Sequence, residues 1–243
     1  MSLRSVKILG ISITISAKKE ILKYIDKSLG KSLTIVTPNP EQIVYAQRDS
    51  QFAKILNKAD IAIPDGIGVA WVLGIERIAG VEFMEDLVGI AAKQGIPVAL
   101  IGGRGDLAVK TFECLSRRTP GLKGWGEELG EIGNLGNLGN LGDLKNIVQK
   151  IQKTGVRIVF VGLGAPKQEY FIARLARQSP AIYMSVGGSF DIITGRTPRA
   201  PQLLRTFGLE WLWRLFREPW RMKRQLALLQ FMWLVTRERF ITR

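Results

Sequence analysis

Short apolar segments alternate with segments of helical periodicity along most of this chain. Five apolar segments each run into a turn of small or polar residues and then into a helical pattern. These five are residues 33–36, 61–63, 98–101, 158–161 and 181–186. Strands that alternate with helices predict parallel pairing through crossover helices. We therefore expect an α/β fold, with an open, mostly parallel, Rossmann-like sheet and helices on both faces.

The segments around these strands complete the expected fold. Residues 6–15 predict one or two opening strands, because isoleucines alternate there with hydroxyl side chains. Helical patterns cover residues 18–29, 41–57, 66–73 and 81–93, and another ends at 149–154. We expect no signal peptide at the start, and no run reaches the ~18–20 apolar residues that cross a bilayer.

The turns after the predicted strands are the first candidates for a ligand site. In a parallel sheet they lie along the carboxyl edge, where open sheets of this kind bind ligands. Gly102-Gly103-Arg104-Gly105 and Gly162-Leu163-Gly164 could cradle a phosphate, and Pro166 suits the first position of the helix after the second turn. Gly187-Gly188-Ser189 leads into another helix, which Ser189 is expected to cap. Alternatively, these glycines only form the tight turns that end buried strands.

Asp65 is the most informative acidic residue. It follows the predicted strand 61–63, between Pro64 and Gly66, and so lies at the expected ligand edge. Partial burial there would raise the pKa of its carboxyl group and make it a better general base. The alternative is an ordinary Asp-Gly turn.

Other polar side chains at this edge also allow two interpretations. Thr37 and Asn39 lie in a turn stiffened by two prolines and could donate to a ligand, or Asn39 could simply cap the next helix. Arg77 could hold a phosphate or carboxylate, or be solvated. Gln168 and Glu169 suit the first turn of a helix electrostatically, and Gln168 could also bind a sugar hydroxyl or a uracil.

Composition narrows the chemistry further. The chain has 243 residues and no histidine, so His-based triads, bases and zinc sites are excluded. Acid–base work must fall to Asp, Glu, Lys or Tyr. The single cysteine, Cys114, allows no intrachain disulfide and favours a reducing compartment. A formal charge of +14 favours anionic partners, which include nucleotide phosphates, nucleic acid and anionic membranes.

Residues 196–243 differ from the rest of the chain. They hold eleven Lys and Arg against three Glu, and four of the six tryptophans. Arg214, Arg217, Arg221 and Arg224 have the spacing of one helix face, and Pro219 predicts a break between two helices. The apolar segment 226–235 beside Arg and Trp is typical of a helix in a membrane interface. A core helix with a basic outer face and an RNA-binding tail are the alternatives.

Two domains are expected. Residues 1–195 would form the α/β domain that carries the ligand edge, and residues 196–243 a membrane-associating helical appendage. Residues of about 126–144 carry repeated Gly-Asn-Leu triplets and predict a low-complexity loop insertion, to which we assign no chemistry.

Several stretches together resemble the WecG/TagA/CpsF family of bacterial glycosyltransferases. They occur in the family's order between residues 33 and 225: TPNPEQIVYA, IAIPDGIGVAW, RIAGVEFMEDL, VALIGG, IVFVGLGAPKQE, SVGGSFDIITG and RAPQLLRTFGLEWLWRLFREPWR. The resemblance implies transfer of an N-acetylhexosamine-type sugar, similar to N-acetylmannosamine, from a UDP donor to a polyprenyl-diphosphate-linked sugar. It also implies inversion at the anomeric carbon, no required metal or other cofactor, and work on cell-surface polysaccharides at the cytoplasmic face of the membrane.

The resemblance also implies that residues 1–195 are a nucleotide-sugar-binding catalytic domain, and it implies roles for individual residues. Asp65 would be the general base, with Thr37 and Asn39 in the substrate-contacting turn. Because the chain has no Asp-x-Asp metal clamp, the leaving diphosphate would need helix N-termini and cations. The expected substrate-binding residues are Arg77, Gly102, Gly103, Gly162, Gly164, Lys167, Gln168, Glu169, Gly187, Gly188, Arg214, Arg221 and Arg224. The Gly-Asn-Leu insertion departs from the family pattern, as does Glu82, where Asp is frequent.

Three hypotheses follow. The first is this transferase at an anionic membrane surface, with self-association of the apolar tail as a further possibility. The second is a non-catalytic UDP-sugar sensor or scaffold at the membrane. The third is a nucleic-acid-binding protein, which the concentration of basic and aromatic residues in one tail disfavours.

Overall fold

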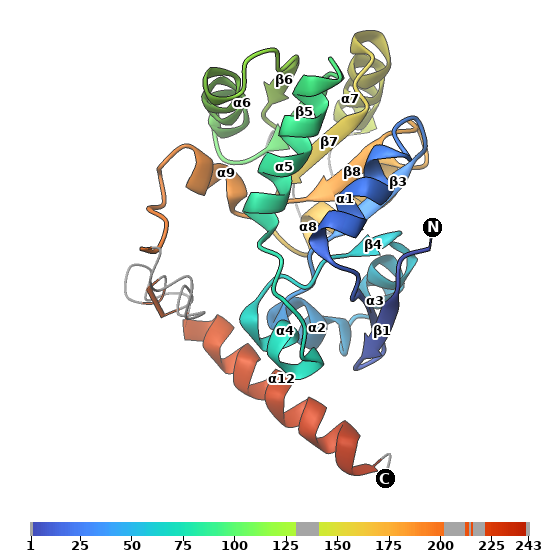
Figure 1. Ribbon diagram of the computed structural model, residues 1–243, viewed down its shortest axis with the longest axis vertical. Helices are drawn as coiled ribbons and strands as arrows, with labels where there is room; N and C mark the ends of the chain where they lie inside the picture. Colours follow the sequence, from blue (N-terminus) through green and yellow to red (C-terminus); the bar gives the residue numbers. More distant parts are fainter. Residues whose placement is uncertain (1, 130–140, 202–211, 214, 216–221, 242–243) are drawn as a thin grey trace.

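The computed structural model describes residues 2–129, 141–201, 212–213, 215 and 222–241, with only the backbone at 141–143, 222–225 and 239–241 (Figure 1). Within them, a six-stranded sheet has the order β4-β3-β8-β7-β5-β6, and every neighbouring pair is parallel. The strands are β3 Leu33–Val36, β4 Ile61–Ala62, β5 Val98–Gly102, β6 Gly124–Glu127, β7 Ile158–Gly162 and β8 Ile182–Ser185. The expected α/β class and parallel sheet are confirmed.

Helices cover both faces of this sheet (Figure 1). They are α1 Lys18–Asp26, α2 Pro40–Ala46, α3 Ser50–Lys58, α4 Ile67–Leu73, α5 Gly80–Lys93, α6 Leu107–Arg118, α7 Leu141–Thr154, α8 Lys167–Leu175, α9 Ser189–Ile193 and α12 Met222–Ile241. Successive residues of β7 face opposite layers. Phe160 belongs to a buried cluster with residues of α1, α5, α6 and α9, whereas Val161 belongs to one with residues of α7 and α8. Strands buried on both faces explain why their sequences are apolar without alternation.

The opening residues form a separate antiparallel hairpin of β1 Ser5–Ile8 and β2 Ile11–Thr14. The hairpin is attached to the sheet edge by Thr14, whose hydroxyl accepts a hydrogen bond from the Ala62 backbone N–H at 3.0 Å. Ile11 and Ile13 are buried against the same cluster as Ala62. The structure thus has two strands where the sequence predicted one or two.

The predicted single helix over 41–57 is wrong, because the structure divides it into α2 and α3. Helix α2 ends at Ala46, and Asp49 then begins the next helix as its N-cap. The Asp49 side chain accepts hydrogen bonds from the backbone N–H groups of Gln51 and Phe52 at 3.0 and 2.9 Å. An Asp at this position favours a new helix start over continuation of the old one.

Strand β6 was not predicted, because glycines at 124 and 126 are poor strand formers. Their role is close packing. A Cβ at Gly124 would lie 1.9 Å from the Val98 carbonyl oxygen, and one at Gly126 would lie 2.3 Å from that of Ala108.

The loop insertion expected at about 126–144 overlaps regular structure at both ends. Strand β6 ends at Glu127, and helix α7 begins at Leu141. Most of the insertion's Gly-Asn-Leu triplets lie outside the described residues.

Helix α12 packs against the body of the protein beside α2 and α4 (Figure 1). Phe231 and Val235 are buried in a cluster with residues of α2 and α4. Gly68 on α4 permits this approach, since a Cβ there would lie 2.7 Å from Leu228 Cδ1. In the part of the chain that the structure describes, no helix combines the length and apolar character needed to cross a membrane. The expected division at residue 195 stays a prediction.

Candidate active site

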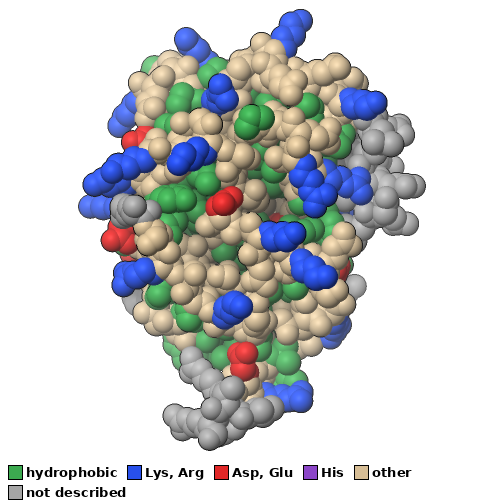
Figure 2. Space-filling model, turned by 90° about the vertical axis from the view of Figure 1, so that its right-hand side faces the viewer, with side chains coloured by type: hydrophobic (Ala, Val, Ile, Leu, Met, Phe, Trp, Pro, Cys, Tyr) green, Lys and Arg blue, Asp and Glu red, His purple; other side chains and the backbone are tan. Residues whose placement is uncertain are grey.

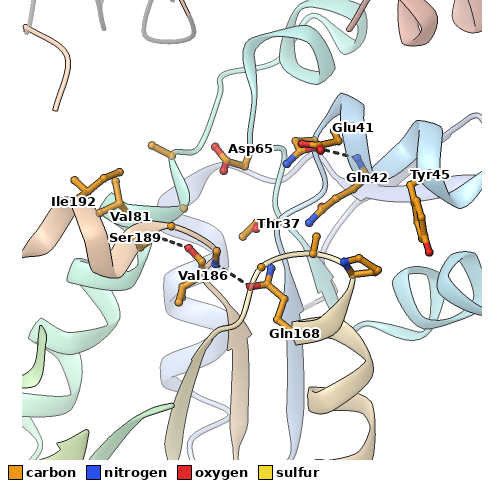
Figure 3. Close-up of a pocket in the computed structure, with 18 of the residues that line it drawn as sticks. Thr37, Glu41, Gln42, Tyr45, Asp65, Val81, Gln168, Val186, Ser189 and Ile192 are labelled. Atoms are coloured by element: carbon orange, nitrogen blue, oxygen red, sulfur yellow. Dashed lines mark hydrogen bonds between the residues drawn. The ribbon is translucent and has the colours of Figure 1, made fainter. Parts of the chain in front are cut away.

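A cavity of about 230 Å³ opens at the carboxyl edge of the sheet, where β3, β4, β7 and β8 end (Figure 3). The turns after these four strands each contribute to its wall, as the parallel arrangement predicts. The wall comprises Thr37, Asn39, Glu41, Gln42, Tyr45, Phe52, Asp65, Arg77, Ala79, Gly80, Val81, Gly164, Ala165, Pro166, Gln168, Val186, Gly187, Gly188, Ser189 and Ile192. Segments more than a hundred residues apart in sequence therefore meet at one site.

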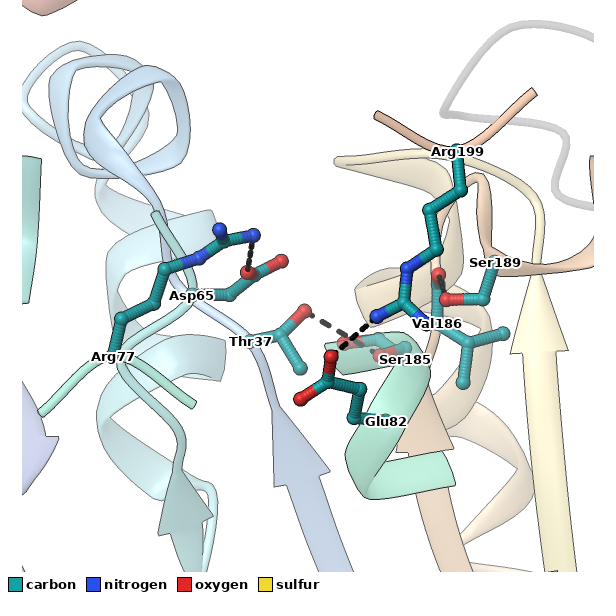
Figure 4. Close-up of polar contacts among 8 residues, drawn as sticks. All are labelled: Thr37, Asp65, Arg77, Glu82, Ser185, Val186, Ser189 and Arg199. Carbon is teal, nitrogen blue, oxygen red and sulfur yellow. Dashed lines mark hydrogen bonds and ion pairs between the residues drawn. The ribbon is translucent and has the colours of Figure 1, made fainter. Parts of the chain in front are cut away.

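Asp65 lies at one side of this cavity, beside the start of α5. Its Oδ1 atom is 3.5 Å from Arg77 Nη2, and both side chains are only partly exposed (Figure 4). Gly80 lies next to both Asp65 and Thr37, because a Cβ there would be in ordinary van der Waals contact with Asp65 Oδ2 at 3.5 Å and with Thr37 Cγ2 at 3.6 Å. The site thus places a carboxylate, a guanidinium and a hydroxyl close together on a half-buried surface.

Thr37 and Asn39 both line the cavity, and each makes a structural hydrogen bond. The buried Thr37 hydroxyl donates to the Ser185 carbonyl oxygen at 3.4 Å, which joins the ends of β3 and β8. Asn39 caps α2, because its Oδ1 accepts from the Gln42 N–H at 3.0 Å. The capping alternative is therefore realised, and the amide nitrogen is the donor that Asn39 can offer to a ligand.

Gln168 reaches the wall from the first turn of α8, whereas Glu169 lies behind it. They are 2% and 1% exposed, and only Gln168 lines the cavity. Gln168 Oε1 accepts a hydrogen bond from the Gly187 N–H at 3.0 Å (Figure 3). Burial raises the pKa of the Glu169 carboxyl group to about 7, and the weaker effects of Gln168, the Glu169 backbone and Ser185 oppose that rise.

This buried carboxyl group predicts a pH-dependent stability. The folded pKa of about 7 exceeds the ordinary 4.5, so Glu169 favours folding below pH 4.5, and that contribution is lost as pH rises through about 7. Wild type should lose on the order of 3 kcal/mol of unfolding free energy across this window relative to Glu169→Gln. Urea unfolding of both proteins from pH ~5 to pH ~8 tests this. Parallel curves for the two proteins would contradict it.

The glycine-rich turns differ in their positions. Gly164, Gly187 and Gly188 line the cavity, whereas Gly102, Gly103 and Gly162 are absent from the described wall. A Cβ at Gly162 would lie 2.7 Å from Phe190, and one at Gly102 would lie 2.6 Å from Leu163. The Gly103 N–H donates to the Gly162 carbonyl oxygen at 2.9 Å. These three glycines serve close packing in the structure.

Packing at Gly162 gives a stability prediction. Gly162→Ala should lower the unfolding free energy by about 1–3 kcal/mol, because the new methyl group would overlap Phe190. Gly89→Ala is the matched control, since a Cβ there, inside α5, would meet nothing within 4 Å. This control should raise stability by about 0.5–1 kcal/mol through helix propensity. Equal urea midpoints for Gly162→Ala and wild type would contradict the assignment.

The structure also tests what was expected of Pro166, Lys167 and Ser189 at the starts of α8 and α9. Pro166 is the N-cap of α8 rather than its first residue, and Lys167, the first residue, lies outside the described wall. The prediction that Ser189 caps α9 is wrong, because Gly188 is the N-cap. The Ser189 hydroxyl instead donates to the Val186 carbonyl oxygen at 2.7 Å, which tightens the turn (Figure 4).

Sequence reasoning missed an ion pair at the rim of the site. Arg199 Nη2 lies 2.5 Å from Glu82 Oε1 in the first turn of α5 (Figure 4). Arg196 lies 3.5 Å from Asp106 Oδ1. The two arginines among prolines after α9 were the signal in the sequence for these ion pairs. Their acidic partners could not be predicted, because they are about ninety or more residues away.

The arginines expected to bind substrate in the tail cannot be placed in the site. Arg214 and Arg221 lie outside the described residues, as does the side chain of Arg224.

Comparison with protein families identifies the family to which this chain belongs. The model of the family described as "Glycosyl transferase WecG/TagA/CpsF family" matches residues 6–243, nearly the whole chain. The chain belongs to this family. The protein is therefore a glycosyltransferase, and its cavity is the candidate active site. Among the described residues, no group of three or more His, Cys, Asp or Glu side chains is arranged to hold a metal ion.

Proposed function

We propose that this glycosyltransferase moves an N-acetylhexosamine-type sugar from a UDP donor to a polyprenyl-diphosphate-linked sugar during cell-surface polysaccharide synthesis. The transfer would invert the anomeric carbon and need no metal. The observation that carries the proposal is the position of Asp65, beside Arg77 and Thr37 in a cavity formed by four post-strand turns. The family match supports glycosyl transfer, and the finer assignments are our own.

The proposed chemistry is a single displacement. Asp65 takes the proton from an acceptor hydroxyl as that oxygen attacks the anomeric carbon. The bond from the anomeric carbon to the diphosphate oxygen breaks on the opposite face, and UDP leaves with the electron pair. Arg77, whose Nη2 lies 3.5 Å from Asp65 Oδ1, would stabilise the negative charge that develops on the diphosphate.

Two backbone N–H groups of the turn after β8 are already bonded within the protein. The Gly187 N–H is bonded to Gln168, and the Ser189 N–H is bonded to the Val186 carbonyl oxygen. The cavity volume of about 230 Å³ also lies below the ~300–1,000 Å³ of sites that bury a drug-sized ligand. We infer that the site encloses only part of the donor. The basic appendage with Arg214, Arg221 and Arg224 would supply the remaining cations and hold the acceptor's diphosphate.

An apolar surface supports the proposed position at the inner face of the cell membrane. Trp71 of α4 is 70% exposed, and Leu229 and Trp233 of α12 are 68% and 59% exposed. Leu226, Leu229 and Trp233 lie on one face of α12, opposite the buried Phe231 and Val235. Trp71 belongs to α4, which packs beside α12, and we refer to Trp71, Leu226, Leu229 and Trp233 together as the apolar face. Arg237 stacks over Trp233, and this pairing of Arg with Trp suits an anionic lipid interface.

Basic side chains are spread widely over the visible surface of the molecule (Figure 2). A nucleic-acid-binding protein would share that property, so nucleotide selectivity is the discriminating test. Calorimetric titration should show that UDP binds more tightly than ADP or GDP. Wild type and Asp65→Asn should both show this preference. Equal affinity for all three nucleotides, together with a steep salt dependence of RNA binding, would favour the nucleic-acid hypothesis instead.

A further inference from the structure

A chain of buried hydrogen bonds runs behind the wall of the candidate active site. Gln42 Nε2 and Gln168 Nε2 both donate to Glu169 Oε1, at 3.3 and 2.8 Å. Gln168 Oε1 in turn accepts from the Gly187 N–H at 3.0 Å. The chain therefore joins the first turns of α2 and α8 to the turn between β8 and α9. All three segments contribute to the cavity wall.

Glu169 is the one member of this chain that does not reach the described wall of the cavity. The side chains of Gln42, Gln168, Glu169 and Ser185, here called the Glu169 cluster, are all buried. The first two line the cavity, and Glu169 contacts both of them from behind. Its contact with the cavity wall is therefore made through the two carboxamides.

We propose that Glu169 is a positioning residue, whose buried carboxyl group preorganises the donor-binding wall by fixing Gln42, Gln168 and, through Gln168, the Gly187 turn. The proposal rests on the proposed function, because it assigns a role within that same site. Fixed donors and acceptors stabilise a transition state best when they need no rearrangement during the reaction. Thr37 holds the other side of this turn, since its hydroxyl donates to the Ser185 carbonyl oxygen.

The cluster favours a neutral Glu169. Three of its buried atoms have no hydrogen-bond partner in the described structure: Gln42 Oε1, Glu169 Oε2 and Ser185 Oγ. A proton on Oε2 gives this set a second donor besides the Ser185 hydroxyl and leaves Oε1 free to accept from both carboxamides. The Ser185 hydroxyl lowers the pKa of the Glu169 carboxyl group, but the effect of burial is larger. The groups that act on this carboxyl from α2, α8 and β8 are amides, backbone and a hydroxyl, and no charged side chain among them offsets a buried carboxylate.

The wall should therefore loosen as pH rises and Glu169 ionises. Glu169→Gln keeps an acceptor oxygen and stays neutral at every pH, whereas Glu169→Ala leaves both carboxamides without their acceptor. Loss of a buried acceptor corresponds to roughly a tenfold to hundredfold weaker interaction. Glu113→Gln is the matched control, because Glu113 is a solvated carboxylate on α6, remote from the cavity.

The test measures UDP affinity from pH 6 to pH 8.5 together with NMR hydrogen exchange at the Gly187 N–H. The ratio of the wild-type Kd to the Glu169→Gln Kd cancels the titration of UDP itself. We expect this ratio to rise on the order of tenfold through about pH 7. Glu169→Ala should bind UDP about 10- to 100-fold more weakly and exchange the Gly187 proton faster than wild type.

The outcomes separate this proposal from the proposed function. A constant Kd ratio, with Gly187 protected equally in wild type and in Glu169→Ala, would overturn the positioning role. If wild type binds no UDP, the donor assignment fails, and the Gly187 exchange rates alone then decide whether Glu169 orders this turn. If Glu169→Ala does not fold, the pH profile of Glu169→Gln gives the decision.

Discussion

Asp65→Asn is expected to lower kcat by about 100- to 10,000-fold, while the Kd for UDP changes by less than about threefold. The carboxamide fills the same space as the carboxylate and cannot accept the proton of the attacking hydroxyl. Its oxygen can still accept from Arg77, which lies 3.5 Å from Asp65 Oδ1 in the wild type. The separation between kcat and UDP affinity marks a residue that acts in the chemical step.

Asp191→Asn is the control for this variant. Asp191 lies in α9 and is absent from the described cavity wall, although it is only two residues from Ser189, which lines it. The control should keep kcat within about threefold, as surface changes away from such features usually have small effects. Wild-type kcat in Asp65→Asn would mean that another group takes the proton, even with the family assignment unchanged.

Simultaneous replacement of Trp71, Leu229 and Trp233 by serine is expected to reduce binding to anionic vesicles by on the order of 100-fold or more. Burying such a side chain contributes about 1.5–3 kcal/mol, so even partial insertion of three adds up to that loss. Secondary structure and UDP affinity should be unchanged, because all three side chains are largely exposed. Co-sedimentation with phosphatidylglycerol-containing vesicles measures the effect.

Val6→Ser and Val109→Ser serve as controls for the vesicle experiment. Both valines are exposed apolar residues, on β1 and α6, and neither belongs to the apolar face. Their replacement should leave vesicle binding unchanged. If the triple variant sediments with vesicles as wild type does, the apolar face is not the membrane contact. Binding that vanishes at high salt in wild type would then point to the basic residues alone.

Most of the fold could be predicted from the sequence. Each of the five predicted strands became a strand of the parallel sheet, because a segment buried on both faces must be apolar throughout. Strand β6 could not be predicted in this way. Its glycines are required by the backbone of β5 and α6, and those contacts appear only after the chain has folded. The break at Asp49 is of a different kind, because Asp is a common N-cap residue and the sequence therefore contains the signal for a new helix start.

The sequence could predict those residues of the candidate site that closely follow a strand. Thr37, Asp65, Gln168 and Gly187 each follow a strand closely, so the topology alone brings them to one edge. Pairings across the fold were not predictable. The bond between Gln42 and Glu169 joins residues 127 positions apart, and Arg199 meets Glu82 across 117 positions. Likewise, the sequence could not distinguish the cavity glycine at 164 from the packing glycine at 162.

The most direct test of the central claim is a UDP-release assay. It would combine the full chain with a panel of UDP-sugars, a short-chain polyprenyl-diphosphate-GlcNAc acceptor and EDTA. We predict that at least one UDP-N-acetylhexosamine releases UDP only when the acceptor is present, that EDTA does not abolish the release, and that Asp65→Asn nearly does. Binding of UDP without release from any donor would contradict the transferase mechanism proposed here and favour a sensor or scaffold, and loss of release in EDTA would contradict its metal independence.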